Sequence, residues 1–191
     1  MRDVSHFEVA IRNAYDRVMT ERWDGDGHWL LDDRSPVRMP VMRSSARGQL
    51  DANRINRKII DDAVARLRPG FSAGSLIASL TLGFWVHLSD RSREAVIWRT
   101  YLYQAWPKGT NRAGLQRSLD SILRLRNRVA HNERLFDPSA PELSPTHVDS
   151  DLVRLFAALC PEAKARVNGN SGMTPVEAFL RRSPAPADIA L

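Results

Sequence analysis

The sequence predicts an all-α fold, a helical bundle within one domain. At least four segments place apolar residues three and four positions apart, which is the spacing of one face of an α-helix. No segment shows the apolar–polar alternation that is typical of a half-buried strand. A chain of 191 residues is long enough to bury a core. We expect the domain to cover residues 1–182, with a loosely ordered tail at 183–191.

The N-terminal part predicts one helix followed by a loop. The apolar residues that share a face of this helix are Phe7, Ala10, Ile11, Ala14, Tyr15 and Val18. Gly, Asp and Pro interrupt the pattern in the stretch 23–36, which predicts a loop. We expect a loop or a small hairpin within residues 23–43, and no other strand pairing.

The middle of the chain continues in helical patterns. A second helix is expected from about Ser44 to Leu67, where the tripeptide RPG ends it. A more apolar helix is expected from about Ala73 to Leu88, and its neighbours predict that His87 is packed in the core. The stretch 92–106 is read as helix or irregular structure.

The rest of the chain predicts three further helices. The longest runs from about Arg112 to Arg134, and a proline-rich loop follows at 137–145. The stretch from His147 to Val167 is expected to be helical. Residues 174–182 form a short helix with Pro175 in its first turn, where proline is favoured.

Composition limits the classes of function. The net charge of +6 favours a polyanionic partner, RNA or DNA first, although only three of the 28 cations are lysines and a GC-rich genome also produces such an arginine excess. The single Cys160 excludes an internal disulfide, and no His or Cys residues have metal-ligand spacing. The longest nearly uncharged run, 75–88, is too short to span a membrane. We therefore expect a cytoplasmic protein without a bound metal.

Arg126 interrupts the apolar face of the long helix. On a wheel of about 100° per residue it lies near the centre of the arc formed by Leu115, Leu119, Ile122, Leu123, Val129 and Ala130. A buried guanidinium without a partner is costly, so Arg126 must meet a carboxylate or an anionic ligand. One interpretation is a structural ion pair with Glu133 or Glu8. The other is a site that binds and cleaves a phosphodiester, with Asn127 and His131 beside Arg126.

Spacing alone does not separate these interpretations. Arg22 and His28, in the stretch RWDGDGH, have a similar separation within a predicted loop. The stretch RNRVAH (126–131) differs because it lies in a predicted helix and places a polar residue directly after the arginine.

RNRVAH resembles the Arg-x4–6-His motif of the HEPN superfamily, which prefers a polar residue such as Asn127 after its arginine. Three longer blocks, 5–18, 79–88 and 105–133, are similar to the abortive-infection, or Abi-like, branch of that superfamily and occur in its order. Together they span most of residues 5–136.

The resemblance implies an HEPN-like helical bundle that dimerises through its motif helices. It further implies a metal-independent endoribonuclease without cofactor, acting as a toxin or phage-defence effector, with RNA as substrate and an antitoxin or regulatory RNA as a further partner. Arg126 and His131 match the catalytic pair, and Asn127 matches its polar companion. The residues that match supporting or substrate-orienting positions of the Abi-like pattern are Glu8, Arg12, Asn13 and Glu133.

The chemistry agrees with these residue types. RNA supplies its own nucleophile, the 2′-OH, while an imidazole can transfer the proton and a guanidinium can hold the phosphate. On an ideal helix, however, Arg126 and His131 point about 140° apart, which favours a site shared between two subunits. Two alternatives remain: a noncatalytic module of the same fold that binds RNA or protein, and a purely structural helical protein in which Arg126 pairs with Glu133.

Overall fold

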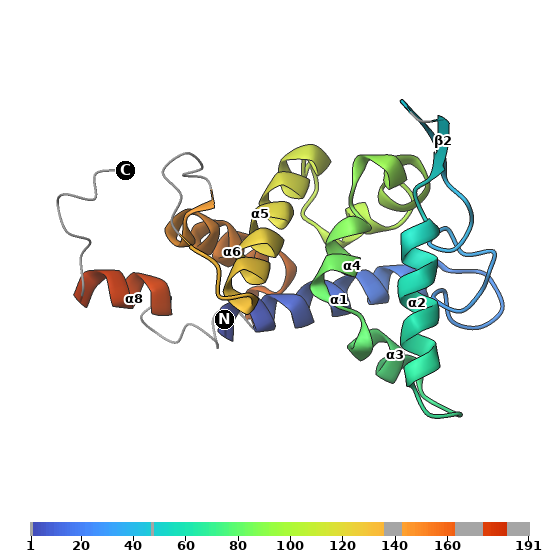
Figure 1. Ribbon diagram of the computed structural model, residues 1–191, viewed down its shortest axis with the longest axis horizontal. Coiled ribbons are helices and arrows are strands. Elements are labelled where there is room, and N and C mark those ends of the chain that lie inside the picture. The colour runs from blue at the N-terminus through green and yellow to red at the C-terminus, as the bar shows by residue number, and fades with distance from the viewer. Residues whose placement is uncertain (1, 47, 136–142, 163–173, 183–191) are drawn as a thin grey trace. The chain divides into compact units, whose positions relative to one another are not determined.

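The computed structural model describes residues 2–46, 48–135, 143–162 and 174–182. These residues are mostly helical and contain one two-stranded hairpin, which confirms the all-α fold (Figure 1). The elements are α1 (Arg2–Arg22), β1 (Met42–Ser45), β2 (Gly48–Asp51), α2 (Arg54–Arg66), α3 (Ala73–Ser79), α4 (Leu82–His87), η1 (Arg91–Arg93), η2 (Glu94–Trp98), η3 (Leu102–Ala105), α5 (Arg112–Ala130), α6 (Pro145–Leu159) and α8 (Pro175–Arg182).

The chain divides into two compact units. The first comprises Met1–Ala10 and Arg117–Leu191, and the second comprises Ile11–Gln116. The boundaries fall inside helices α1 and α5, so both helices contribute to both units. The single domain over 1–182 stays a prediction, and the expected tail at 183–191 lies outside the described residues.

The core of the unit Ile11–Gln116 is built around aromatic side chains. Trp85 packs edge-on against Trp29 and Phe84, with ring centroids 6.2 and 5.1 Å apart. Ile11, Ala14, Tyr15 and Val18 are buried, as the apolar face of the first helix predicted. These contacts exclude water from the interior and supply the main hydrophobic stabilisation of the unit.

Tyr15 also forms a buried polar network in this core. Its hydroxyl lies 2.6 Å from Ser89 Oγ and accepts a hydrogen bond of 3.1 Å from Trp106 Nε1. Burial raises the pKa of Tyr15 to about 12, although the bonds with Ser89 and Trp106 act in the opposite direction. The neutral phenol is therefore the form that this core accommodates.

The stretch 23–41 forms loop and turns, one of the two alternatives predicted for 23–43, and the hairpin follows it. Strand β1 pairs antiparallel with β2 over residues 42–51, rather than within 23–43, and the helix expected from Ser44 begins at Arg54. Asp51 Oδ1 accepts hydrogen bonds of 2.9 Å from the backbone N–H groups of Val41 and Asn53, which close the base of the hairpin. Figure 1 shows the hairpin at the N-terminal end of α2.

The apolar stretch 73–88 forms two helices instead of one. Leu80 and Thr81 have extended backbones, with ψ of 136° and 162°, and they separate α3 from α4. Thr81 occupies the N-cap position of α4, a site where threonine is favoured. The stretch 92–106, which was predicted to be helix or irregular structure, contains 3-10 and π turns. In the π turn, the backbone N–H of Arg99 donates a hydrogen bond to the carbonyl of Glu94, five residues earlier.

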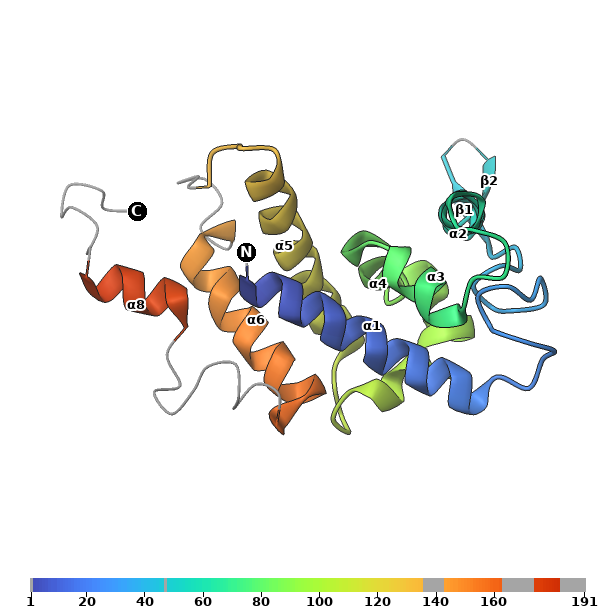
Figure 2. The ribbon, with the colours of Figure 1, turned by 90° about the horizontal axis from the view of Figure 1, so that it is seen from below.

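The other unit contains the C-terminal part of α5, α6 and α8. Helix α6 lies beside α5 (Figures 1 and 2), and Arg154 of α6 donates a 3.1 Å hydrogen bond to Ser118 Oγ of α5. Helix α6 ends at Leu159, earlier than predicted, and residues 163–167 of the expected helix lie outside the described residues. Helix α8 begins at Pro175 as expected. Most of the proline-rich loop at 137–145 also lies outside the described residues.

Candidate active site

The candidate site lies where helix α5 ends. This helix stops at Ala130, whereas the sequence analysis extended it to about Arg134. Glu133 therefore lies beyond the helix, and the wheel that placed it near the direction of Arg126 does not apply to it. Glu133 is exposed.

A Schellman motif terminates the helix. Asn132 adopts a left-handed backbone conformation with φ of 55°. Its N–H bonds the carbonyl of Val129 at 3.3 Å, and the N–H of Glu133 bonds the carbonyl of Arg128 at 2.8 Å. Asparagine is second to glycine at this position because its short polar side chain tolerates the left-handed region. Asn132 is therefore a helix-end signal within the sequence, although the helix was predicted to continue to about Arg134.

His131 is the last residue held by the helix. Its backbone N–H still bonds the carbonyl of Asn127 at 3.0 Å, and its side chain is exposed. The imidazole thus lies at the carbonyl end of α5. An exposed imidazole at this position can exchange a proton with a ligand that approaches from the solvent.

Arg126 is less buried than predicted. Leu115, Leu119 and Ile122 are buried, but Arg126 is only half-buried and Ala130 is exposed. A helical wheel shows on which side of a helix a residue lies, and it does not show how far the covering elements extend along that helix. The expected deep burial of Arg126 was wrong for this reason.

Arg126 has no carboxylate partner within the described residues. Its Nη1 donates a 3.3 Å hydrogen bond to Asn127 Oδ1, and it forms no ion pair with Glu8 or Glu133 in that part of the chain. The structure therefore brings Arg126 and Asn127 together and leaves Glu133 apart from them. The guanidinium keeps most of its donors for an anion.

The other supporting residues lie on helix α1. Glu8 is half-buried in the unit that contains Arg126. Arg12 and Asn13 belong to the unit Ile11–Gln116, where Asn13 is exposed. Arg12 Nε is buried and has no hydrogen-bond partner among the described residues.

His28, which has the same kind of spacing from an arginine, is held in a structural network. Its Nε2 lies 3.2 Å from Asp16 Oδ1, which also accepts a 2.8 Å hydrogen bond from Trp29 Nε1. Its Nδ1 accepts the backbone N–H of Leu30 at 3.2 Å. Both ring nitrogens of His28 are occupied, whereas the exposed imidazole of His131 has no hydrogen-bond partner among the residues that the structure describes.

Within the described ranges, no three His, Cys, Asp or Glu residues gather in an arrangement that could hold a metal ion. None of the helices in the described part of the chain combines the length and the apolar character needed to cross a membrane.

Comparisons of the chain with protein-family models, curated proteins and solved structures find no match.

Proposed function

We propose that the chain is a metal-independent endoribonuclease of the HEPN type, acting as a toxin or phage-defence effector in the cytoplasm. The observation that carries this proposal is the end of α5, where a half-exposed guanidinium has no carboxylate partner among the described residues and an exposed histidine follows five residues later. The residues in this place are those of the motif RNRVAH. A structural ion pair of Arg126 with Glu133 or Glu8 is the rival interpretation, and neither pair is formed within the described residues.

The roles follow from the chemistry of each group. Arg126 neutralises the charge that develops on the phosphate, and Asn127 orients the guanidinium through its Oδ1. His131 exchanges a proton with the 2′-OH or with the leaving oxygen. Because the 2′-OH of RNA is the nucleophile, cleavage survives EDTA and leaves 2′,3′-cyclic phosphate and 5′-OH ends. DNA, which has no 2′-OH, is not cleaved.

Two subunits complete the proposed site. On an ideal helix, positions 126 and 131 point about 140° apart, and His131 lies one residue beyond the end of α5, so we infer that one chain aims the two side chains poorly at a single phosphate. A twofold dimer through the motif helices combines Arg126 of one chain with His131 of the other. An antitoxin or a regulatory RNA is a further proposed partner that would restrain the activity.

The second candidate is a noncatalytic HEPN-fold module that binds RNA or protein. The divergence of the two side chains on α5 favours it, because binding an anion through Arg126 needs no alignment with His131. This candidate predicts affinity for RNA without turnover.

The test is His131→Ala in the purified protein, with His147→Ala as a matched control. His147 is an exposed histidine on α6 outside the motif. Loss of a proton-transfer group lowers the cleavage rate by about 10²–10⁴-fold, so His131→Ala should fold normally and lose nearly all activity, while His147→Ala keeps it. Full RNase activity in folded His131→Ala would contradict the proposed mechanism. RNA binding without cleavage in the parent protein would instead select the noncatalytic module.

A further inference from the structure

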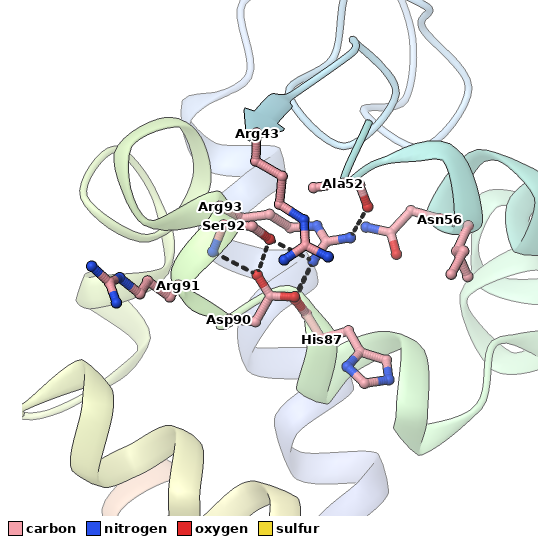
Figure 3. A pocket seen from close by; sticks show the side chains of 9 residues that line it. Arg43, Ala52, Asn56, His87, Asp90, Arg91, Ser92 and Arg93 are labelled. Atoms are coloured by element: carbon pink, nitrogen blue, oxygen red, sulfur yellow. Dashed lines mark hydrogen bonds and ion pairs between the residues drawn. The ribbon is translucent and has the colours of Figure 1, made fainter. Parts of the chain in front are cut away.

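A pocket of about 400 Å³ lined by several charged and polar residues lies in the unit Ile11–Gln116, away from the motif residues in sequence. Elements distant along the chain form it: β1 contributes Arg43, α2 contributes Asn56, α4 contributes His87, and the turn around η1 contributes residues 90–93 (Figure 3). No sequence pattern predicted this pocket. His87, which was predicted to be buried, is exposed.

Arg93 forms the inner wall of the pocket. It is only 4% exposed, and it donates hydrogen bonds to Asn53 Oδ1 at 2.9 Å and to the carbonyl of His87 at 3.0 Å. It also bonds the carboxylate of Asp90 and the carbonyl of Ala52. The charge of Asp90 is thereby matched by a buried cation, and this network makes the wall rigid.

Positive charge remains after this pair is formed. Three guanidinium groups line the pocket against one carboxylate. Arg43 and Arg91 form no ion pair or side-chain hydrogen bond within the described residues. In Figure 3 the guanidinium of Arg43 extends over Asp90 and Arg93, whereas the Arg91 side chain points away from them. Arg43 is therefore the cation that is free to bind a ligand in the pocket.

Asn56 supplies a second donor. The residue is 1% exposed, and its Nδ2 has no hydrogen-bond partner among the described residues. A buried amide nitrogen without an acceptor costs about 1–3 kcal/mol, so an oxygen of a bound ligand would stabilise this group. Figure 3 shows the amide of Asn56 on the side of the pocket that faces Arg93 and Arg43. The pocket thus offers donors to an anion.

We propose that this pocket binds a backbone phosphate of an RNA strand, with Arg43 and Asn56 as the donors. The guanidinium fork matches the paired oxygens of a phosphate, and the pocket volume suits a group of nucleotide size. The inference rests on the proposed function for the identity of the strand, and it adds a docking position outside the catalytic motif. A phosphate contact positions the strand and does not read the 2′-OH.

The test measures binding of a 2′-O-methyl RNA oligonucleotide, which cannot be cleaved by 2′-OH attack, by fluorescence anisotropy over a range of salt concentrations. The variant is Arg43→Gln, and the matched control is Arg68→Gln, an exposed arginine of the same unit that does not line the pocket. Arg43→Gln should weaken binding about 5–10-fold and lower the slope of log K against log salt by about 0.7, whereas Arg68→Gln should change binding by about twofold or less. Equal effects of the two substitutions overturn the proposal.

Asn56→Asp provides a second arm, because it keeps the shape of the side chain and replaces a donor with a negative charge. It should weaken binding at least as much as Arg43→Gln, with thermal unfolding as the check that the protein is folded. If the Asn56→Asp protein is folded and binds RNA with the affinity of the parent, the result contradicts the proposed site. Because Arg43 is on the surface, Arg43→Gln decides the question if Asn56→Asp does not fold.

Inorganic phosphate and AMP serve as competitors. AMP could bind the parent protein more tightly than the RNA oligonucleotide does, with this binding lost in Arg43→Gln. That result would assign the pocket to a free nucleotide and overturn the assignment to RNA. Single-stranded DNA of the same sequence should bind with the same sensitivity to Arg43→Gln and remain uncleaved. DNA binding that is unaffected by Arg43→Gln contradicts a phosphate contact.

The two proposals fail separately. If His131→Ala abolishes cleavage and Arg43→Gln leaves RNA binding unchanged, the docking site is wrong and the ribonuclease stands. If the parent protein cleaves no RNA and Arg43→Gln weakens RNA binding, the docking site stands and the ribonuclease is wrong.

Discussion

Arg126 is a residue whose surroundings make it a direct test of function. It is half-buried and bonded to Asn127, so its removal leaves neither a large core cavity nor, within the described residues, a carboxylate that has lost its partner. A structural arginine such as Arg93, which holds several buried groups, is the opposite case. Stability and activity can therefore be separated at position 126.

We expect Arg126→Ala to lower the free energy of unfolding by less than about 1 kcal/mol and to lower the cleavage rate by about 10²–10³-fold. Arg126→Lys keeps the charge and loses the bidentate fork, so its rate should fall by less while its stability stays close to that of the parent. Thermal unfolding and single-turnover cleavage measure the two effects. Arg124→Ala, an exposed arginine of the same helix, is the control. A strongly destabilised Arg126→Ala with normal turnover in its folded fraction would support a structural role instead.

At the scale of elements, the end of α5 decides where His131 lies. The Schellman motif requires a left-handed residue at position 132, and the asparagine there has φ of 55°. The hydrogen bonds from residues 132 and 133 to the last turn stop the helix directly after His131. The backbone conformation of Asn132 is therefore linked to the position of the imidazole.

Substitutions of Asn132 test this link. Asn132→Gly removes the steric cost of the left-handed conformation and should leave both stability and turnover close to those of the parent. Asn132→Val places a β-branched residue in that region and should cost about 1–2 kcal/mol of stability. It should also reduce cleavage in protein that is still folded, since the helix end shifts. Unfolding in urea and steady-state cleavage of a defined RNA measure both. Equal turnover in the two variants would show that the helix end does not position His131.

At the scale of the whole molecule, stability depends on pH through groups whose pKa the fold shifts. Burial alone would raise the pKa of Asp16, but hydrogen bonds from His28, Trp29 and Thr20 outweigh it and the pKa is lowered. The pKa of Asp51 is lowered in the same way: burial opposes the shift, and bonds from Arg57 and the backbone outweigh it.

A lowered pKa contributes stability that is present above the unfolded value, about 3.9 for Asp, and is lost as pH falls through the folded value. The pKa of Tyr15, raised to about 12, contributes stability that is present below its usual value near 10 and is lost as pH rises to the folded value. The melting temperature should therefore fall below about pH 4 and above about pH 10. A series of thermal unfolding curves checks this, and Asp16→Asn should flatten the acid side. If the melting temperature of Asp16→Asn falls below pH 4 as steeply as that of the parent, the role of Asp16 is contradicted.

The proposed dimer also belongs to this scale, and mixing inactive variants tests it. Arg126→Ala and His131→Ala subunits are mixed under conditions that exchange subunits. If each site takes Arg126 from one chain and His131 from the other, a mixed dimer has one intact site, and random exchange restores about a quarter of the parent activity. If both residues act within one chain, the mixture stays inactive. A monomeric mass at micromolar concentration with full activity would exclude the shared site altogether.

What the sequence determined by itself was local. The all-α class, the buried face of α1 and the start of α8 at Pro175 follow from periodicity and from single-residue preferences. The end of α5 was also present in the sequence, because Asn132 is the kind of residue that accepts a left-handed backbone. Each of these features depends on residues a few positions apart, so a short window of sequence contains its cause.

The tertiary structure decided the rest. The hairpin at 42–51 has largely exposed strands without apolar–polar alternation, and the Asp51 carboxylate closes it by accepting two backbone hydrogen bonds. The pocket at Arg43 depends on Arg93 bonding Asn53, forty residues earlier in the chain. The burial of Arg126 depends on how far other elements extend along α5. A pattern of residues indicates which side of a helix is apolar, but contacts between distant segments depend on how the chain folds back on itself, and no local window contains that information.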